Sequence, residues 1–206
     1  MTIAIIGLGN MGKGLAQRLA GKTDLVLGAR DQAAATAFIA TLGGKAEVTS
    51  LEAAAAKADI VVLALPYAAG LDFAKSPALA GKILVDISNP IKPDFSGMTL
   101  GFTTSAAEQL QAAAPQSQVV KAYNTIFSSL FALPAVQTAA VPVFLAGNDE
   151  AAVAKVAELV ELSGFAVEKA GTLEAARLIE PVGMLNIKLA FGGLGTGIAP
   201  SWMRVS

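Results

Sequence analysis

The sequence predicts an α/β fold with a doubly wound, mostly parallel sheet and a helical extension at the C-terminus. Three observations favour this class. Short runs of Val, Ile and Leu alternate with alanine-rich segments along most of the 206 residues, which is the pattern of βαβ units. Hydrophobic residues make up 54% of the chain, as expected when helices cover both faces of a parallel sheet. A glycine-rich turn joins the first predicted strand to the first predicted helix.

The short apolar runs are the predicted strands. In chain order they are Thr2–Ile6, Asp24–Gly28, Ala46–Val48, Asp59–Ala64, Lys82–Asp86, Gln118–Ala122 and Val141–Ala146. One further strand, over Phe165–Lys169, alternates apolar and polar residues. Such alternation is typical of a strand that is buried on one side only, so we expect it at an edge of the sheet.

The alanine-rich segments are the predicted helices, and several begin at a residue that can cap a helix. They are Asn10–Ala20, Asp31–Leu42, Ser50–Lys57, Thr104–Ala114 and Asp149–Leu162. A long helix is expected from Leu173 to about Phe191, followed by the glycine-rich segment Gly192–Gly197. We therefore expect a sheet domain over residues 1–170 and a C-terminal helix with its tail, residues 171–206, packed on it as one compact unit.

Composition excludes several classes of partner. The formal net charge of -1 offers no basic surface for nucleic acid, so nucleic acid is not an expected partner. The longest uncharged apolar run, residues 60–71, is broken by Pro66 and is shorter than the ~20 residues of a membrane span. The chain starts within a strand and not with a secretory signal, so we expect no membrane part and a cytoplasmic location.

The chain contains no cysteine and no histidine. This excludes disulfides, thiolate nucleophiles and Ser-His-Asp catalysis, and we expect no metal site, because the commonest transition-metal ligands are missing. An enzyme with this composition would take its reactive chemistry from an organic cofactor.

The glycine turn is the sequence Gly7-Leu8-Gly9-Asn10-Met11-Gly12. It has the GxGxxG spacing of a Rossmann-type dinucleotide-binding loop, in the required place between a buried strand and a helix. In that loop Gly7 permits the tight turn, Gly9 lets the pyrophosphate approach the backbone, and Gly12 allows helix and strand to pack closely. A purely structural turn is the alternative. We predict that residues 1–170 bind a dinucleotide.

The end of the second predicted strand favours NADP over NAD. NAD sites usually place an acidic residue there to bind the ribose, whereas this chain has Ala29 and Arg30. The small Ala29 leaves room for a 2′-phosphate, and Arg30 can bind it through a forked, charge-assisted contact. In the alternative interpretation Arg30 is solvated and Asp31 serves as the ribose ligand or as a helix cap.

Residues that directly follow strands four, five and six complete the predicted site, because ligands of open α/β sheets bind at the carboxyl ends of strands. Prolines in these segments would shape loops against the nicotinamide, while amides and hydroxyls could hydrogen-bond the carboxamide or the hydride acceptor; simple turn residues are the alternative. The residues concerned are Leu65, Pro66, Asn89, Pro90, Asn124 and Thr125.

No single catalytic residue is predicted; the candidates are Tyr67, Tyr123, Asn124, Thr125 and Lys188. Tyr67 and Tyr123 could donate a proton or stack on a flat ring, and Lys188 could act as an acid in carbonyl reduction. The alternatives are packing or surface placement for the tyrosines and a solvated helix position for the lysine.

Several segments together resemble one family, the NADP oxidoreductases that couple NADPH to the deazaflavin coenzyme F-420, and the related cytoplasmic reductase domains of STEAP metalloreductases. The resemblance implies that Leu8, Asn10 and Met11 line the pyrophosphate, that Ala29 and Arg30 bind the 2′-phosphate, and that the loop after Leu65 flanks the nicotinamide. It also implies hydride transfer to a flavin or deazaflavin. The segments are residues 5–16, 28–30, 61–66, 85–90, 119–126 and 141–149.

The sequence departs from the deazaflavin enzymes at two places, which leaves the acceptor open. Gln32-Ala33-Ala34 stands where they tend to have a lysine, and Asn124-Thr125 stands where they tend to have a His-Thr pair. The leading hypothesis is an NADPH-dependent reductase of a flat, conjugated acceptor. The alternatives are a redox sensor that binds NADP without turnover, and a reductase of small carbonyls or imines. We also expect a homodimer that pairs through the apolar C-terminal region, which includes Trp202.

Overall fold

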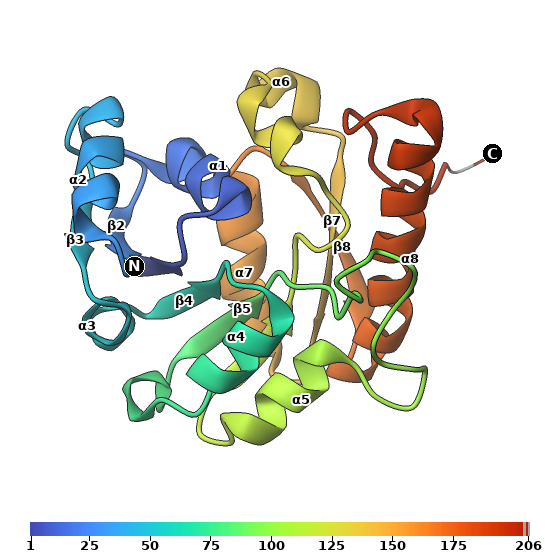
Figure 1. Ribbon diagram of the computed structural model, residues 1–206, viewed down its shortest axis with the longest axis horizontal. Helices are drawn as coiled ribbons and strands as arrows, with labels where there is room; N and C mark the ends of the chain where they lie inside the picture. Colours follow the sequence, from blue (N-terminus) through green and yellow to red (C-terminus); the bar gives the residue numbers. More distant parts are fainter. Residues whose placement is uncertain (204, 206) are drawn as a thin grey trace.

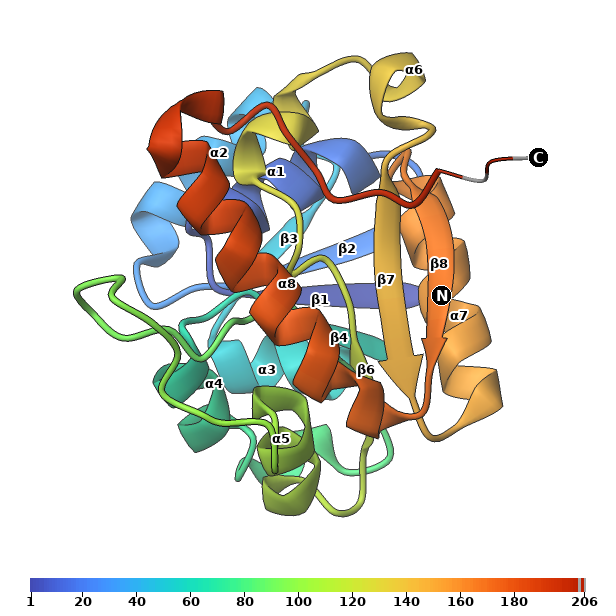
Figure 2. The same ribbon diagram turned by 90° about the vertical axis from the view of Figure 1, so that its right-hand side faces the viewer.

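The computed structural model describes residues 1–203 and 205. Within them, one sheet of eight strands runs through the molecule in the order β3-β2-β1-β4-β5-β6-β7-β8 (Figures 1 and 2). The strands are β1 Thr2–Ile6, β2 Asp24–Gly28, β3 Glu47–Thr49, β4 Ile60–Leu63, β5 Ile83–Asp86, β6 Gln118–Lys121, β7 Pro142–Gly147 and β8 Ala166–Gly171.

Helices connect these strands and cover both faces of the sheet. The α-helices are α1 Asn10–Leu19, α2 Gln32–Thr41, α3 Leu51–Lys57, α4 Tyr67–Phe73, α5 Ala106–Ala113, α6 Ala135–Thr138, α7 Glu150–Leu162 and α8 Ala176–Leu189. The shorter segments are the 3₁₀ turns η1 Pro77–Leu79, η2 Ser128–Ala132 and η3 Leu173–Ala175, and the π turn η4 Ala190–Leu194.

Strand side chains point alternately to the two faces, and each face has its own core. Ile3 and Ile5 of β1 pack in a cluster with buried residues of α1 and α7. Ala4 and Ile6 face the other way and pack with residues of α3 and α5. Helix α8 covers β7 on the face of the sheet to which Ala4 and Ile6 point, and its Ile179 packs against Phe144 of that strand. In Figure 2 this helix passes diagonally in front of the strands.

The predicted fold class is confirmed, with two differences in detail. Strand β7 runs antiparallel to β6, an exception that the predicted mostly parallel sheet allowed but did not locate. The chain between them, residues 122–141, carries only the short elements η2 and α6, so β7 starts at the end of the sheet where β6 stops and needs no crossover helix. The second difference is helix α4, which the sequence did not predict; it begins directly after Pro66, a residue interpreted as shaping a loop.

The edge strand and the C-terminal helix agree with the sequence prediction. Strand β8 is the last strand of the sheet, and α8 with its flanking turns spans the region predicted from residue 173 to 191. Among the described residues, no helix combines the length and the apolar character that crossing a membrane would require.

Candidate functional site

The candidate site lies where strands β1, β2, β4, β5 and β6 end. These strands are parallel and in register, so their carboxyl ends lie along one edge of the sheet. Two hollows of about 370 Å³ and 630 Å³ open there. Gly9, Ala64, Leu65 and Pro66 line both of them, so the two hollows form one cleft that bends around the glycine loop.

The three glycines of the loop are required for different reasons. Gly7 has a φ of +99°, and a Cβ there would lie 2.6 Å from the carbonyl oxygen of Ala64. A Cβ on Gly12 would lie 2.0 Å from the carbonyl oxygen of Gly7. Gly9, by contrast, is exposed and has no atom within 4 Å of a built Cβ. Packing thus demands the outer two glycines, while the middle one leaves its backbone open to the cleft, which is where a pyrophosphate would approach.

Helix α1 differs from its neighbours at its first turn. Helices α2, α3, α5 and α7 each begin at an Asp or Ser whose side chain accepts a hydrogen bond from a first-turn N–H. Helix α1 begins at Gly9 and has no side-chain cap. The N–H groups of its first turn therefore remain available for an anion at the positive end of the helix. Asn10 and Met11 of that turn line the larger hollow, and Leu8 lines the smaller one.

The smaller hollow collects positive charge at the end of β2. Arg30 lines it together with Ala29 and Lys13, and the Arg30 side chain is exposed and makes no hydrogen bond or ion pair among the described residues. Asp31 also borders the hollow, but its carboxylate caps α2 by accepting the N–H of Ala34 at 3.0 Å. The geometry thus assigns Asp31 to the cap and leaves Arg30 free for a phosphate. Lys13 was missed from the sequence, although its place directly after the glycine loop is a usable signal.

The larger hollow has a floor made of two asparagines. Asn89 donates from Nδ2 to the carbonyl oxygen of Asn124 at 2.7 Å, and Asn124 donates from Nδ2 to Oδ1 of Asn89 at 2.9 Å. Helix α8 packs directly on this pair at Gly183, where a Cβ would lie 2.8 Å from both Asn124 O and Asn89 Oδ1. Asn186, one turn further on, donates to the carbonyl oxygen of Thr125 at 3.0 Å. The cleft is therefore closed by helix α8, of which the sequence analysis had named only Lys188 as a candidate site residue.

Two buried polar atoms of this hollow have no partner. Asn124 and Thr125 are 5% and 1% exposed, and neither Asn124 Oδ1 nor Thr125 Oγ1 makes a hydrogen bond among the described residues. Leaving a buried donor or acceptor unsatisfied costs about 1–3 kcal/mol. The carboxamide of a nicotinamide carries both donors and an acceptor, so the residues present fit the nicotinamide half of a dinucleotide.

A buried charged cluster supports the loop after β5. The ammonium group of Lys121 donates to Asp86 Oδ2 at 2.8 Å, to Glu180 Oε1 at 2.9 Å and to the carbonyl oxygen of Ser88 at 2.5 Å. Glu180 also accepts the N–H groups of Ala106 and Ala107 at the start of α5. Burial raises the pKa of Glu180 despite the neighbouring lysine. Because Lys121 fixes the Ser88 carbonyl, the cluster holds Asn89 and its loop in place.

Of the five catalytic candidates, Tyr67, Tyr123 and Lys188 line neither hollow, whereas Asn124 and Thr125 line the larger one. Tyr67 starts α4, and its hydroxyl donates to Gln109 Oε1; burial, followed by the charges of Glu180 and Asp86, raises its pKa. Tyr123 lies in the core with a φ of +56° and a hydrogen bond of 3.0 Å to Ser163, and burial raises its pKa. Lys188 is exposed on α8. The structure thus places Tyr123 in the packing role and Lys188 in the solvated role that the sequence left open.

Other predicted residues divide between the cleft and its supports. Leu65 and Pro66 stand where the two hollows meet, and Asn89, Asn124 and Thr125 line the larger one. Pro90 is buried and lines neither hollow; its carbonyl oxygen accepts the N–H of Thr99 at 2.7 Å. The residues that sequence reasoning missed include Phe95, Gly183 and Asn186.

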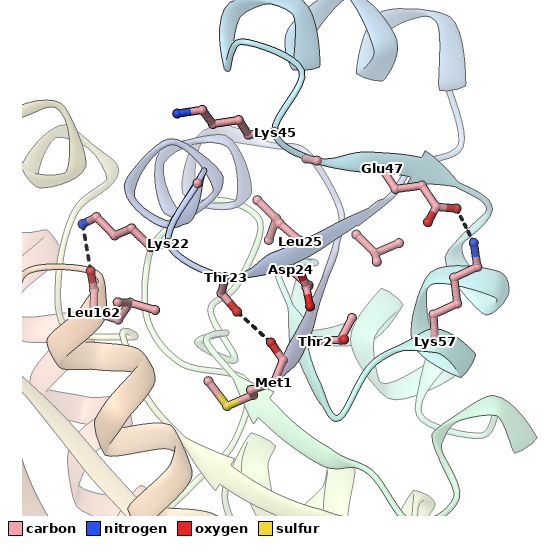
Figure 3. Close-up of a pocket in the computed structure, with 13 residues that line it drawn as sticks. Met1, Thr2, Lys22, Thr23, Asp24, Leu25, Lys45, Glu47, Lys57 and Leu162 are labelled. Atoms are coloured by element: carbon pink, nitrogen blue, oxygen red, sulfur yellow. Dashed lines mark hydrogen bonds and ion pairs between the residues drawn. The ribbon is translucent and has the colours of Figure 1, made fainter.

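A third and larger hollow, of about 1020 Å³, lies at the opposite, amino end of β1 and β2 (Figure 3). Several of its polar groups already have partners in the protein. Lys57 pairs with Glu47, Lys22 donates to the carbonyl oxygen of Leu162 at 3.0 Å, and Thr23 donates to the carbonyl oxygen of Met1 at 2.7 Å. Satisfied, largely exposed groups of this kind do not indicate a built ligand site. The candidate site is therefore the cleft at the carboxyl edge.

The fold and the cleft define the class of protein, a dinucleotide-dependent oxidoreductase. The family model described as NADP oxidoreductase, coenzyme F420-dependent, matches residues 2–90. The F420-dependent NADP reductase of Methanocaldococcus jannaschii is 31% identical, over 96% of this chain and 97% of that protein. The chain therefore belongs to the coenzyme F420-dependent NADP oxidoreductase family and is an NADP-dependent oxidoreductase.

Two further relatives support this assignment. Metalloreductase STEAP3 of Rattus norvegicus is 32% identical over 87% of this chain, which spans only 36% of that longer protein. A crystal structure of a protein from Arthrobacter sp. FB24, described as a candidate F420-dependent NADP reductase, has a TM-score of 0.84 and 33% identity, covering 99% of this chain and 100% of that one. The family resemblance read from the sequence is confirmed.

Proposed function

We propose that this chain transfers a hydride between NADP(H) and a flat, conjugated acceptor of the flavin or deazaflavin type. One observation carries the choice of acceptor: the described residues that line the larger hollow include no ionisable side chain. Reduction of a ketone or an imine calls for a positioned acid. A conjugated ring accepts hydride at a ring atom and can take its balancing proton from water. Its reduction therefore needs no acidic side chain in the lining of the hollow.

The proposed binding mode uses the whole length of the cleft. The pyrophosphate lies against Gly9 and the first turn of α1, and the 2′-phosphate lies between Arg30 and Lys13 in the smaller hollow. The nicotinamide enters the larger hollow, where Asn124 Oδ1 and Thr125 Oγ1 hydrogen-bond its carboxamide. These side chains fix the orientation of the ring, and orientation of two reactants supplies much of the rate in reactions of this kind.

When bound, NADPH would supply a hydride, so that a C–H bond of the dihydronicotinamide breaks, both its electrons pass to the acceptor, and solvent provides one proton to the reduced acceptor. The apolar side chains of the hollow, among them Ile87, Ile126 and Ile187, exclude water from the space between the two rings. Leu65 and Pro66, at the junction of the two hollows, separate the reacting ring from the phosphate region.

The first test is the choice of dinucleotide. Isothermal titration calorimetry with NADPH and NADH is expected to show micromolar or tighter binding of NADPH and weaker binding of NADH. Equal affinity for the two would contradict the role of Arg30, and absence of NADPH binding would contradict the assignment of the cleft.

The second test is the choice of acceptor. NADPH oxidation is measured with FMN, a deazaflavin, a quinone, a ferric chelate and, as a contrast, simple ketones and cyclic imines. Turnover with the ring acceptors is expected. Turnover with ketones or imines alone would favour the carbonyl or imine reductase alternative, and tight NADPH binding without any turnover would favour a redox sensor.

We also propose that the chain forms a homodimer through its C-terminal region. Leu178, Leu185 and Leu189 lie on one outward stripe of α8 and are largely exposed, and Trp202 packs on Phe144 while most of its surface stays exposed. A second copy would cover this apolar stripe. Light scattering is expected to give twice the chain mass, and Leu185→Glu should give the single-chain mass. A monomeric native protein would end this proposal.

A further inference from the structure

We propose that Phe95 and Phe191 form an aromatic face at the mouth of the larger hollow, and that this face receives the ring of the hydride acceptor and selects flat, conjugated heterocycles. The inference rests on the proposed function, because it concerns the acceptor of that same site. It adds the residues that determine which acceptors bind, and neither residue belongs to the motifs that identify the family.

Phe95 is carried on a built hairpin between β5 and α5. Ile91 and Met98 form an antiparallel bridge, and the N–H of Lys92 donates to the carbonyl oxygen of Gly97 at 2.9 Å. At the tip, Asp94 accepts the N–H of Ser96 at 3.0 Å, and this bond lowers the pKa of Asp94. The green segment of Figure 1 that contains the hairpin passes beside α8. The hairpin is therefore held together by its own hydrogen bonds and gives Phe95 a defined position.

Phe95 has an unusual backbone and an unusual exposure. Its φ is +56°, a left-handed conformation that bulky residues rarely adopt. Its side chain nevertheless gains little burial, because the residue is 55% exposed while it lines the larger hollow. Strain at a residue that contributes little to the core is characteristic of ligand sites, where the bound molecule makes use of the enforced position.

Phe191 supplies the second ring from η4, the π turn that directly follows α8. Its ring centroid lies 6.5 Å from that of Phe95, with the two planes tilted by 55°. It is 76% exposed and lies in the π turn Ala190–Leu194, a deviation from regular helix that occurs often at functional sites. Ile187, one turn earlier, lines the hollow. The two phenylalanines therefore continue the apolar wall outward from the place where the nicotinamide is proposed to lie.

The chemistry of this face defines its ligand. Two exposed rings whose centroids lie 6.5 Å apart favour another flat ring, which they can contact by stacking or edge-to-face packing. An acceptor held there would lie against the nicotinamide end of the cleft, as hydride transfer requires. A small aliphatic ketone would gain much less from the two rings, so the face discriminates between acceptor classes.

The experiment measures kcat and KM for lumiflavin, a three-ring isoalloxazine without a phosphate tail, at saturating NADPH. Phe95→Asn removes the ring but keeps the backbone, because asparagine tolerates the left-handed conformation better than other residues with side chains. Phe95→Tyr keeps the ring, and Phe191→Ala removes the second ring. Phe102→Ala is the matched control, since Phe102 is 72% exposed in the same connection but neither lines the hollow nor pairs with another ring.

Phe95→Asn and Phe191→Ala are each expected to raise the KM for lumiflavin roughly five- to tenfold, the scale of losing one ring contact. Phe95→Tyr and Phe102→Ala should stay within twofold of the native protein. An unchanged KM in Phe95→Asn, with native turnover of lumiflavin intact, would overturn the aromatic face but leave the proposed function standing.

If the native protein binds NADPH yet reduces no ring acceptor, the proposed function fails, and the aromatic face is then judged by binding alone. Lumiflavin fluorescence is titrated with the NADP-bound protein in the native form and in Phe95→Asn. Saturable binding that weakens in the variant supports the face. Absence of binding to the native protein overturns it as well.

Discussion

The two ends of the sheet carry hollows that differ in chemistry more than in size. The hollow at the amino end is the larger, at about 1020 Å³, but its charged side chains are all exposed to solvent, and Lys57 is already paired with Glu47. The cleft at the carboxyl end offers about 370 Å³ and 630 Å³. There the buried atoms Asn124 Oδ1 and Thr125 Oγ1 lack partners, and Arg30 is unpaired among the described residues.

The comparison indicates that a binding site is recognised by polar groups that have no partner within the protein. Buried polar groups without partners are uncommon in folded proteins, and a ligand that completes their hydrogen bonds is one explanation for them. Solvent-exposed ion pairs contribute little to stability, and charges that are already paired do not indicate a ligand site. Equivalent substitutions at the two ends of the sheet should therefore have unequal effects.

The largest effect is expected for Lys121→Met. The variant leaves Asp86 and Glu180 buried without their shared cation, and breaking a buried pair in this way costs about 3–5 kcal/mol. Lys57→Met at the amino hollow breaks a pair that is about half exposed and should cost less than about 1 kcal/mol. Urea unfolding followed by circular dichroism measures both. Similar losses in the two variants would refute the contrast between the two ends.

A second effect is expected for Gly183→Ala, where α8 closes the cleft. The added Cβ would lie 2.8 Å from the backbone oxygen of Asn124 and from the side chain of Asn89, so helix and floor must separate, at a cost of about 3 kcal/mol. NADPH binding should weaken in parallel because the floor moves. Gly70→Ala in α4 is the control, since a Cβ there meets nothing within 4 Å; stability equal to the native protein in both variants would contradict the close packing.

The two parts of the cleft also differ in how far the sequence predicted them. The dinucleotide part is encoded in nearby stretches of sequence. The strand and helix pattern around Gly7, Gly9, Gly12 and Arg30 is enough to assign these residues to the site. The nicotinamide part depends on contacts between distant segments, such as Gly183 against Asn89 and Asn124. Sequence spacing carries no signal for such contacts, so only the residues that immediately follow strands were predicted there.

Side-chain direction was a further limit. Tyr123 comes shortly after β6, like Asn124, yet its side chain turns into the core and bonds Ser163. A strand-end tyrosine can face either way, and only its left-handed backbone and the packing against Phe131 and Phe165 settle the direction. Phe95 was missed for a related reason, since nothing in a polar, proline-containing loop indicates that one aromatic ring will be held over a cleft.

Arg30→Ala tests the smaller hollow. Loss of a charge-assisted contact with the 2′-phosphate should weaken NADPH binding by about 1–3 kcal/mol and leave NADH binding nearly unchanged. Lys45→Ala removes an exposed cation from the amino hollow and should change neither affinity. Calorimetry decides the point. Equal weakening of NADPH and NADH in Arg30→Ala would mean that the residue does not distinguish the two dinucleotides.

The pH dependence of the free energy of unfolding tests the charged cluster without a substitution of Lys121. The raised pKa of Glu180 means that the folded state holds the proton more tightly than the unfolded state does. The stabilising effect of that proton is complete below the ordinary glutamate pKa and is lost as pH rises toward the folded pKa, with a slope of at most about 1.4 kcal/mol per pH unit. Unfolding measured from acid to neutral pH should show this loss in the native protein and not in Glu180→Gln. Parallel pH profiles would exclude the raised pKa.

Thr125→Val should produce the smallest effects, but with opposite signs for folding and for binding. The Thr125 hydroxyl is buried and unpartnered, so replacing it with a methyl group should stabilise the ligand-free protein by up to about 1 kcal/mol. The same change removes a partner of the carboxamide and should weaken NADPH binding several-fold. In Thr23→Val at the amino hollow, the hydroxyl that is lost donates to Met1, so stability should fall slightly and NADPH binding should stay unchanged. Replacing a residue gives a gain in stability together with a loss of affinity only when its hydrogen-bonding group serves the ligand and not the fold. A loss of both stability and affinity in Thr125→Val would show that the hydroxyl supports the fold instead.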